Sequence, residues 1–301
     1  MEGRTIPAGE EPPSKAPPAP RAIVFAHFDR HGGCDPHVVQ ALRRYRRCCD
    51  RLVFVSNGGP RRPPAEVAGL VDDYLSRPNV GYDFCAWRDG LATLRRDAFA
   101  EVICVNDSVY GPLADLGPVL SSPRIQDADL WGMVVSEQPV RPGSRPLRHV
   151  QTWFFAMRQS LLESDLFERF WAGVVPQATK REVIHHYEVG LSHAVEQAGM
   201  RVAGIYDAGL QPRVRLAELL PHVSLFEPRR SWRVLRKGRR MPHNPSELVW
   251  WRLLEAGVPY VKVGLFRVNH YGLDLRRVLG TLERQSGFDA DLIRGHLARC
   301  G

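Results

Sequence analysis

The sequence predicts an α/β protein with a mostly parallel central sheet flanked by helices. Short apolar runs, typical of strands buried on both faces, occur repeatedly between residues 21 and 110. Amphipathic segments with helical spacing separate them, and this alternation favours right-handed crossovers within one sheet. The 301 residues are enough for one large α/β domain or two small ones.

The first half contains three apolar runs that predict strands at residues 22–26, 52–55 and 101–105. The first run is followed by Asp35-Pro36, which indicates a helix cap and the first helical position. A turn at residues 56–60 ends the second run. The predicted helices of this half begin at Pro36, run from Val67 to Leu75, and begin near Ala86.

The second half is more mixed. Strands are predicted at residues 130–135, 150–156, 201–206 and 260–263, and helices at 161–171, 182–197, 246–257 and 289–298. Residues 228–243 are expected to be irregular and very basic. Residues 1–20 are rich in Pro, Ala and Glu, so we expect a disordered tail before a single domain at 21–301.

The bulk composition limits the class of protein. No run of about 18 apolar residues is present, and the first residues contain no apolar signal core, so we expect a cytoplasmic protein. The six cysteines show no metal spacing and are expected to be reduced thiols. The net charge of +8 favours polyanions, although an arginine-rich composition is an equal explanation.

Polar residues follow three predicted strands at the point where each strand ends. In an open parallel sheet, ligands bind at these carboxyl ends. The candidates are His27, Asp29, Arg30, Asn57, Asn106, Asp107 and Ser108. Ordinary loop polarity is the alternative at each position. One carboxylate between two small polar groups at 106–108 suits a divalent cation, a ribose or a sugar hydroxyl, or else an Asx-turn.

Two further segments contain candidate functional residues. In Gly81-Tyr82-Asp83-Phe84, the aspartate could cap the next helix or bind a ligand hydroxyl, and Asp89 lies near the same helix start. In His185-His186-Tyr187-Glu188, the first and last residues share a helical face. That pair could bind a metal, act in acid–base catalysis, or form a solvated ion pair.

One cluster of basic residues stands out, at Arg229, Arg230, Arg233, Arg236, Lys237, Arg239 and Arg240. It could hold a diphosphate, contact a membrane surface, or be a solvated loop, and Trp232 within it favours an interface. Dinucleotide, Walker A, serine-esterase and zinc-protease motifs are absent from the sequence.

Several segments, in their order along the chain, resemble the rhamnan synthesis protein F family. They are residues 81–87, 106–112, 131–132, 149–154 and 187–192, with residues 244–245 and 257–262 resembling its closing part. The resemblance covers about residues 21–272. It implies a GT-A-like glycosyltransferase, with a donor-binding half at 21–115 and an acceptor-binding half at 116–301.

The resemblance also implies roles for individual residues. Asn106-Asp107-Ser108 stands where GT-A enzymes place the element that holds the metal and diphosphate. It offers one acid, so the pattern allows a Mg or Mn ion at Asp107 without requiring it. Glu188 is expected to be the general base that deprotonates the acceptor, with Asp83 in reserve. The donor-binding residues would be His27, Asp29, Asn57, Asp83, Asp89, Asn106, Asp107 and Ser108, and the acceptor-binding residues Trp131, His149 and Gln151.

The expected partners are a nucleotide-sugar donor, such as activated rhamnose, and a saccharide or lipid-linked saccharide acceptor of a cell-surface polysaccharide or lipopolysaccharide. The 229–240 cluster could reach the inner face of the membrane. A non-catalytic carbohydrate- or nucleotide-sugar-binding protein on the same fold is the alternative. Nucleic acid is not expected as a partner, because no recognisable nucleic-acid-binding module is present.

Overall fold

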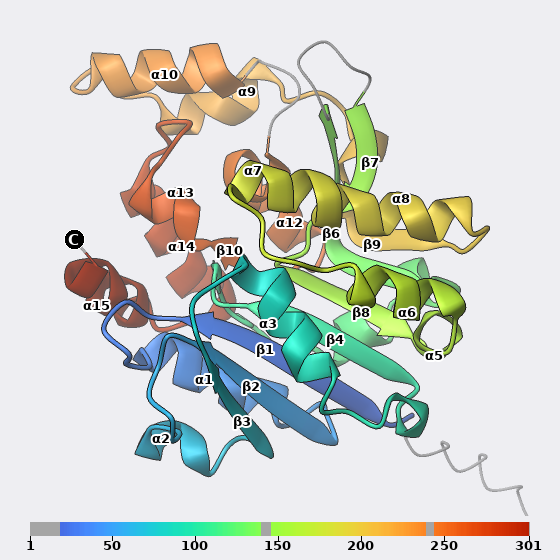
Figure 1. Ribbon diagram of the computed structural model, residues 1–301. Coiled ribbons are helices and arrows are strands. Elements are labelled where there is room, and N and C mark those ends of the chain that lie inside the picture. Colours follow the sequence, from blue (N-terminus) through green and yellow to red (C-terminus); the bar gives the residue numbers. More distant parts are fainter. Residues whose placement is uncertain (1–18, 140–145, 239–243, 301) are drawn as a thin grey trace, which may run out of the picture.

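The computed structural model describes residues 19–139, 146–238 and 244–300 (Figure 1). Its centre is a sheet of eight strands in the order β3-β2-β1-β4-β8-β6-β7, with β9 also paired to β6. The strands β3, β2, β1 and β4 are parallel, and β8 pairs antiparallel to both β4 and β6. The predicted fold class is therefore confirmed, and the arrangement is consistent with a GT-A-like fold.

The strands are β1 Arg21–Phe28, β2 Arg51–Asn57, β3 Asp73–Arg77, β4 Glu101–Asn106, β5 Val109–Tyr110, β6 Leu130–Pro139, β7 Pro146–Val150, β8 Phe154–Arg158, β9 Val202–Asp207 and β10 Val261–Lys262. The helices before β9 are α1 Pro36–Tyr45, α2 Ala65–Ala68, α3 Tyr82–Leu91, α4 Gly117–Leu120, α5 Gln159–Leu162, α6 Asp165–Ala172, α7 Lys180–Val183, a π-helical segment Ile184–Val189, and α8 Gly190–Gln197. Those after β9 are α9 Leu216–Leu219, α10 Pro228–Gly238, α11 Pro245–Leu248, α12 Trp250–Glu255, α13 Val263–Arg267, α14 Leu275–Ser286 and α15 Asp291–Cys300.

Alternate residues of β1 point to opposite faces of the sheet and so contribute to two cores. Ile23 belongs to the core that contains Leu42 of α1, whereas Val24 belongs to the core that contains Trp87 of α3. The helices α3, α6 and α8 lie over the second face in Figure 1. Burial on both faces explains why these strands are continuous apolar runs in the sequence.

Two sequence-based assignments of helix and strand were wrong, and a third concerns residues 228–238. The segment from Val67 to Leu75 is not one helix, because α2 ends at Ala68 and β3 begins at Asp73. The edge strand β3 is only partly buried, so it lacks the alternation that would have identified it. The predicted strand at 150–156 is divided, because β7 ends at Val150 and β8 begins at Phe154.

Residues 228–238 were expected to be irregular but form the helix α10. Its high arginine content hid a helical pattern, in which Ser231, Val234 and Gly238 are buried on one side. Residues 1–18 of the predicted tail and Arg239 and Arg240 of the basic cluster lie outside the described residues. Within the described ranges, none of the helices has the length and apolar character needed to cross a bilayer.

A separate two-stranded sheet links the end of β4 to the last quarter of the chain. Its strand β5 pairs antiparallel with β10, so that Lys262 lies opposite Val109. The backbone N–H of Val263 also donates to the carbonyl of Ser108 at 3.0 Å. This pairing positions β10 and α13 beside the carboxyl end of β4.

Candidate functional site

A cavity of about 630 Å³ opens at the carboxyl ends of β1 and β4. It is the position that the strand-end rule predicts for ligands. The structure brings many of the predicted residues together on its lining: His27, Asp29, Arg30, Asp83, Asn106, Asp107, Ser108, Gln151 and Glu188. These come from both halves of the sequence.

The turn at 106–108 is organised by Asn106. Its side-chain Nδ2 donates to Asp83 at 2.8 Å, and its Oδ1 accepts from both the backbone N–H and the hydroxyl of Ser108. The Asx-turn interpretation therefore holds for Asn106. Asp107 is turned the other way and accepts the backbone N–H of Phe28 at 2.7 Å. The turn leaves one carboxylate at the end of β1.

Burial raises the pKa of both aspartates on this wall of the cavity. The pKa of Asp107 rises to about 7, because burial and the nearby Asp83 outweigh the hydrogen bond from Phe28. The pKa of Asp83 is also raised by burial, against the opposing effects of Asn106 and the nearby lysines. These two carboxyl groups are therefore poised for a cation or for hydrogen bonding to a ligand hydroxyl.

Asp83 lies within the first turn of α3 and is not its N-cap, because that position belongs to Gly81. Gly81 has a φ of +82°, and a Cβ there would lie 2.2 Å from Cys85 Sγ, so only glycine fits. The next residue, Tyr82, also has a positive φ, of 54°, and lines the cavity. A strained backbone at a cavity wall is typical of functional sites.

Lys262 lies across from these acids and was not predicted as a site residue. Its Nζ donates to Ser108 Oγ at 3.0 Å and lies 5.5 Å from the centroid of the Trp153 ring. Burial lowers its pKa to about 8, although Glu188 and Glu247 oppose this. A single lysine in a predicted strand gives no sequence signal of this position. Lys180 also lines the cavity, on its exposed rim.

Glu188 lies in the π-helical segment, which turns its side chain into the cavity. Short π-helical segments are frequent at functional sites. Its Oε2 accepts from the backbone N–H of Thr152 at 2.9 Å and from the hydroxyl of the same residue at 2.6 Å. Its Oε1 lies 3.7 Å from Nε2 of the buried His149. Glu188 is thus a carboxylate held in one orientation. Its expected partner His185 is absent from the cavity lining.

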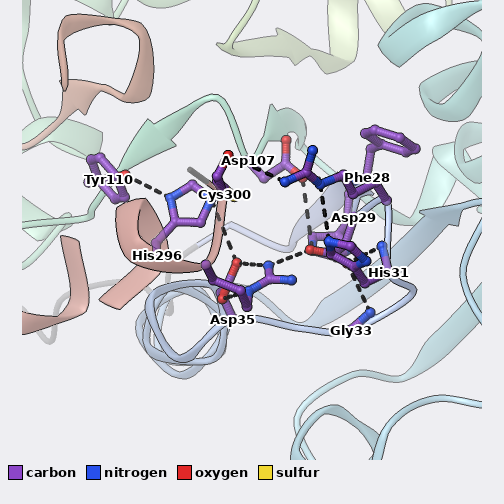
Figure 2. Close-up of polar contacts among 12 residues, drawn as sticks. Phe28, Asp29, His31, Gly33, Asp35, Asp107, Tyr110, His296 and Cys300 are labelled. Carbon is purple, nitrogen blue, oxygen red and sulfur yellow. Dashed lines mark hydrogen bonds and ion pairs between the residues drawn. The ribbon is translucent and has the colours of Figure 1, made fainter. Parts of the chain in front are cut away.

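Asp29 is held by the last helix of the described chain (Figure 2). Its carboxylate accepts the backbone N–H groups of His31 and Gly33 and pairs with Arg299 of α15. Arg299 also pairs with Asp35, donating from Nε at 2.7 Å. Burial alone would raise the pKa of Asp29, but these bonds lower it to about 2.

The same helix places His296 beside the cavity. Its Nδ1 lies 2.7 Å from the hydroxyl of Tyr110, and its Nε2 lies 3.7 Å from Asp35 (Figure 2). Asp35 was predicted as a helix cap, but its side chain makes no capping bond and pairs with α15 instead. His27 is buried behind this group, and burial lowers its pKa to about 4. It is therefore a neutral imidazole near pH 7.

Four predicted site residues are absent from the cavity lining. Asn57 and Asp89 both accept hydrogen bonds from Arg77, which ties the end of β3 to α3. This network accounts for both residues structurally.

Trp131 and His149 are fully buried. The indole of Trp131 donates to Glu101 at 2.7 Å, within the sheet core. The Nδ1 of His149 bonds the carbonyl of Leu147 at 3.0 Å, so its neutral form presents a lone pair on Nε2. Neither is placed to touch an acceptor directly. Gln151 does reach the cavity, where its Nε2 donates to Asn244 at 3.0 Å.

The side chains available as metal ligands could hold a divalent cation only weakly. Among the described residues, no group of three or more His, Cys, Asp or Glu side chains could hold a metal. Asn106 and Ser108 already bond each other, and Ser108 also accepts from Lys262. A Mg or Mn ion could therefore use Asp107 only together with the oxygens of a ligand such as a diphosphate.

The sequence profile of the rhamnan synthesis protein F family matches residues 52–229, which is more than half of the chain. The protein therefore belongs to this family, and the resemblance inferred from short motifs is confirmed. Membership supports glycosyltransferase activity in general.

Two curated relatives share less than a quarter of their aligned residues with this chain. The uncharacterized protein y4gN of Sinorhizobium fredii is 24% identical over 134 residues, covering 44% of this chain and 34% of its own length. The virulence protein VirA of Vibrio anguillarum is 22% identical over 216 residues, covering 69% of this chain and 66% of its own. The chain thus spans about one third of the first relative and just under two thirds of the second.

Solved structures with related chain paths include sugar-nucleotide enzymes. A putative nucleotide-diphospho-sugar transferase from Desulfovibrio desulfuricans is 11% identical, with a TM-score of 0.35, over 62% of this chain and 80% of its own. Glucosyl-3-phosphoglycerate synthase from Mycobacterium tuberculosis, in complex with Mn²⁺, uridine-diphosphate and phosphoglyceric acid, is 12% identical, with a TM-score of 0.37. That match covers 75% of this chain and 81% of the other.

Proposed function

We propose that this protein is a glycosyltransferase that moves a sugar from a nucleotide diphosphate-sugar to a saccharide acceptor. The observation that carries the proposal is a cavity whose lining contains an oriented carboxylate, Glu188, together with the carboxyl group of Asp107 and the ammonium group of Lys262. Sugar transfer needs a base for the acceptor and positive charge for the departing diphosphate. The family assignment supports the same class of reaction.

The donor occupies the side of the cavity built by residues 21–115. His27 and the ordered loop around Asp29 line the nucleotide, and Asp83 and Asp107 bind hydroxyl groups of the ribose or sugar. Lys262 supplies positive charge to the diphosphate, because its ammonium group lies in a buried setting where charges interact strongly. A divalent cation bound between Asp107 and the donor would add further charge neutralisation there.

The acceptor enters from the side built by residues 116–301. Glu188 removes the proton of the acceptor hydroxyl, which then attacks the anomeric carbon while the bond to the diphosphate breaks. Thr152 keeps Oε2 engaged through two hydrogen bonds and so leaves Oε1 as the proton acceptor. His149 lies behind Glu188, with its Nε2 3.7 Å from Oε1, and Gln151 borders the acceptor.

The family description, rhamnan synthesis, supports rhamnose as the donor sugar. The acceptor that we propose is a growing cell-surface polysaccharide or lipopolysaccharide. The location that we propose is cytoplasmic, as expected from the sequence. These finer assignments rest on family membership. The alternative of a non-catalytic nucleotide-sugar-binding protein draws on one observation, the single acid at Asp107 where a metal-binding pair would be expected.

The test is an assay of nucleotide diphosphate release across a panel of nucleotide-sugars, with and without manganese, for the wild-type protein and for Lys262→Met. We expect release with at least one donor and a loss of about 100-fold in Lys262→Met, comparable to removing one charge-stabilising donor from an active site. Donor binding without release would establish the non-catalytic alternative. Absence of binding across the panel would overturn both.

A further inference from the structure

The helix α10 and the turn before it carry large apolar side chains on their surface. Leu225 is 94% exposed, Phe226 is 97% exposed and Trp232 is 58% exposed. Side chains of this size rarely stand free in water beside one another, and exposed apolar groups in contiguous positions indicate an interaction surface. Figure 1 shows α9 and α10 at the periphery of the molecule, away from the central sheet.

The outward face of α10 is also strongly basic. Arg229, Trp232, Arg233 and Arg236 are separated by the three- and four-residue steps that align side chains along one helical face, and all four are exposed. The guanidinium of Arg236 lies 4.6 Å from the centroid of the Trp232 ring. A shallow hollow of about 520 Å³ runs along this face.

The opposite face of α10 is fixed to the protein. Ser231, Val234 and Gly238 are buried, and the backbone of Gly238 packs against Leu219 of α9. Arg230 has a structural role distinct from the outward arginines, because it pairs with Glu227 and donates to the carbonyl of His222. Within the described ranges, the three outward arginines form no ion pair, so their charge is available to a partner.

We propose that this face, made of Leu225, Phe226, Arg229, Trp232, Arg233 and Arg236, docks on the surface of an anionic lipid membrane. Basic side chains are attracted to anionic headgroups, and apolar side chains enter the boundary between headgroups and acyl chains. Trp232 suits that boundary because its ring is apolar and its N–H is polar. Nucleic acid would use the arginines but would leave Leu225 and Phe226 in water.

A short stretch of chain joins the lining of the cavity to the docking face. Val263, Gly264, Arg267 and Val268 line the cavity, and Gly272, a few residues later, packs against Arg233 of α10. A membrane bound by α10 would therefore lie near the acceptor side. The proposal stands independently of the proposed function, because membrane binding can be measured without a donor or an acceptor.

The test is sedimentation of the full chain with vesicles of phosphatidylcholine alone or mixed with phosphatidylglycerol. We expect binding to the mixed vesicles that weakens as salt is raised. The triple variant Arg229→Gln/Arg233→Gln/Arg236→Gln should bind the mixed vesicles on the order of 100-fold more weakly, at roughly fivefold per basic residue. The double variant Leu225→Ser/Phe226→Ser should also weaken binding, with less change in its salt dependence.

A matched control removes the same charge elsewhere: Arg43→Gln/Arg61→Gln/Arg62→Gln, whose three arginines are exposed and distant in sequence from α10. It should bind like the wild type, and all variants should retain the wild-type thermal unfolding midpoint. Trp232 emission should shift to shorter wavelength on adding mixed vesicles, a shift that Trp232→Phe abolishes. The proposal is overturned if mixed vesicles do not bind, if the control loses as much affinity as the α10 variant, or if an oligonucleotide displaces the protein from the vesicles.

Discussion

Replacement of Arg299 by methionine tests whether α15 is held to the donor side of the cavity by charge. Arg299 pairs with both Asp29 and Asp35, whose side chains are only 8% and 10% exposed. Methionine keeps most of the length and apolar surface of the side chain but leaves two buried carboxylates without their cation. Breaking a buried pair in this way typically costs about 3–5 kcal/mol.

The effect of Arg299→Met on the free energy of unfolding should depend on pH, because Arg299 lowers the pKa of Asp29. The pKa of Asp29 is 3.8 as a free side chain and about 2 in the folded protein, and that difference corresponds to roughly 2 kcal/mol of stability. A depressed pKa stabilises the fold fully above the unfolded value, and the contribution is lost as pH falls from about 5 towards about 2. We therefore expect Arg299→Met to lower the unfolding free energy at pH 7 by about 3 kcal/mol or more, and by much less at pH 2.

Urea unfolding at the two pH values measures this difference. The matched control is Arg294→Met on the same helix, because Arg294 forms ion pairs that are exposed to solvent. We expect no measurable change for that control. The reasoning is refuted if Arg299→Met is as stable as the control at pH 7, or if its deficit is the same at both pH values.

Three further outcomes are expected. Glu188→Gln should lower kcat by 10²- to 10⁴-fold, the usual contribution of a general base, while donor affinity is retained. The exposed control Glu255→Gln should keep wild-type turnover. Equal kcat values in the two variants would exclude Glu188 as the base. Trp131→Phe should cost about 1–3 kcal/mol in urea unfolding, because it leaves the buried carboxylate of Glu101 without that hydrogen bond; an unchanged midpoint would contradict this. Gly90→Ala should lower the free energy of unfolding by about 1–3 kcal/mol, because a Cβ there would lie 2.5 Å from a valine methyl of β1 and overpack the core. A variant that calorimetry shows to be more stable than the wild type would contradict this prediction.

Much of the donor side could be predicted from the sequence. Strands buried on both faces are apolar along their whole length, so β1, β2 and β4 stand out, and the polar residues that end them mark one edge of the sheet. That rule located His27 and Asp107 in the cavity. It failed for Asn57, because Arg77 of the unpredicted strand β3 engages its side chain.

Other parts of the site could not be predicted, because they depend on contacts between distant parts of the chain. Arg299 pairs with Asp35 across 264 residues, and Lys262 reaches Ser108 across 154. A single lysine or arginine has no periodicity that would identify such a partner. Glu188 was predicted through family resemblance, whereas the π-helical turn that directs it into the cavity has no equivalent sequence signal.

The pairing of β5 with β10 has a consequence for ligand selection. The ladder places Lys262 opposite Val109, the residue that follows Ser108, and the ammonium of Lys262 donates to the Ser108 hydroxyl at 3.0 Å. A movement of the 106–108 turn would therefore carry the backbone of Lys262 with it. If Lys262 contacts the donor diphosphate as proposed, we expect nucleoside diphosphates to bind more tightly than monophosphates of the same base.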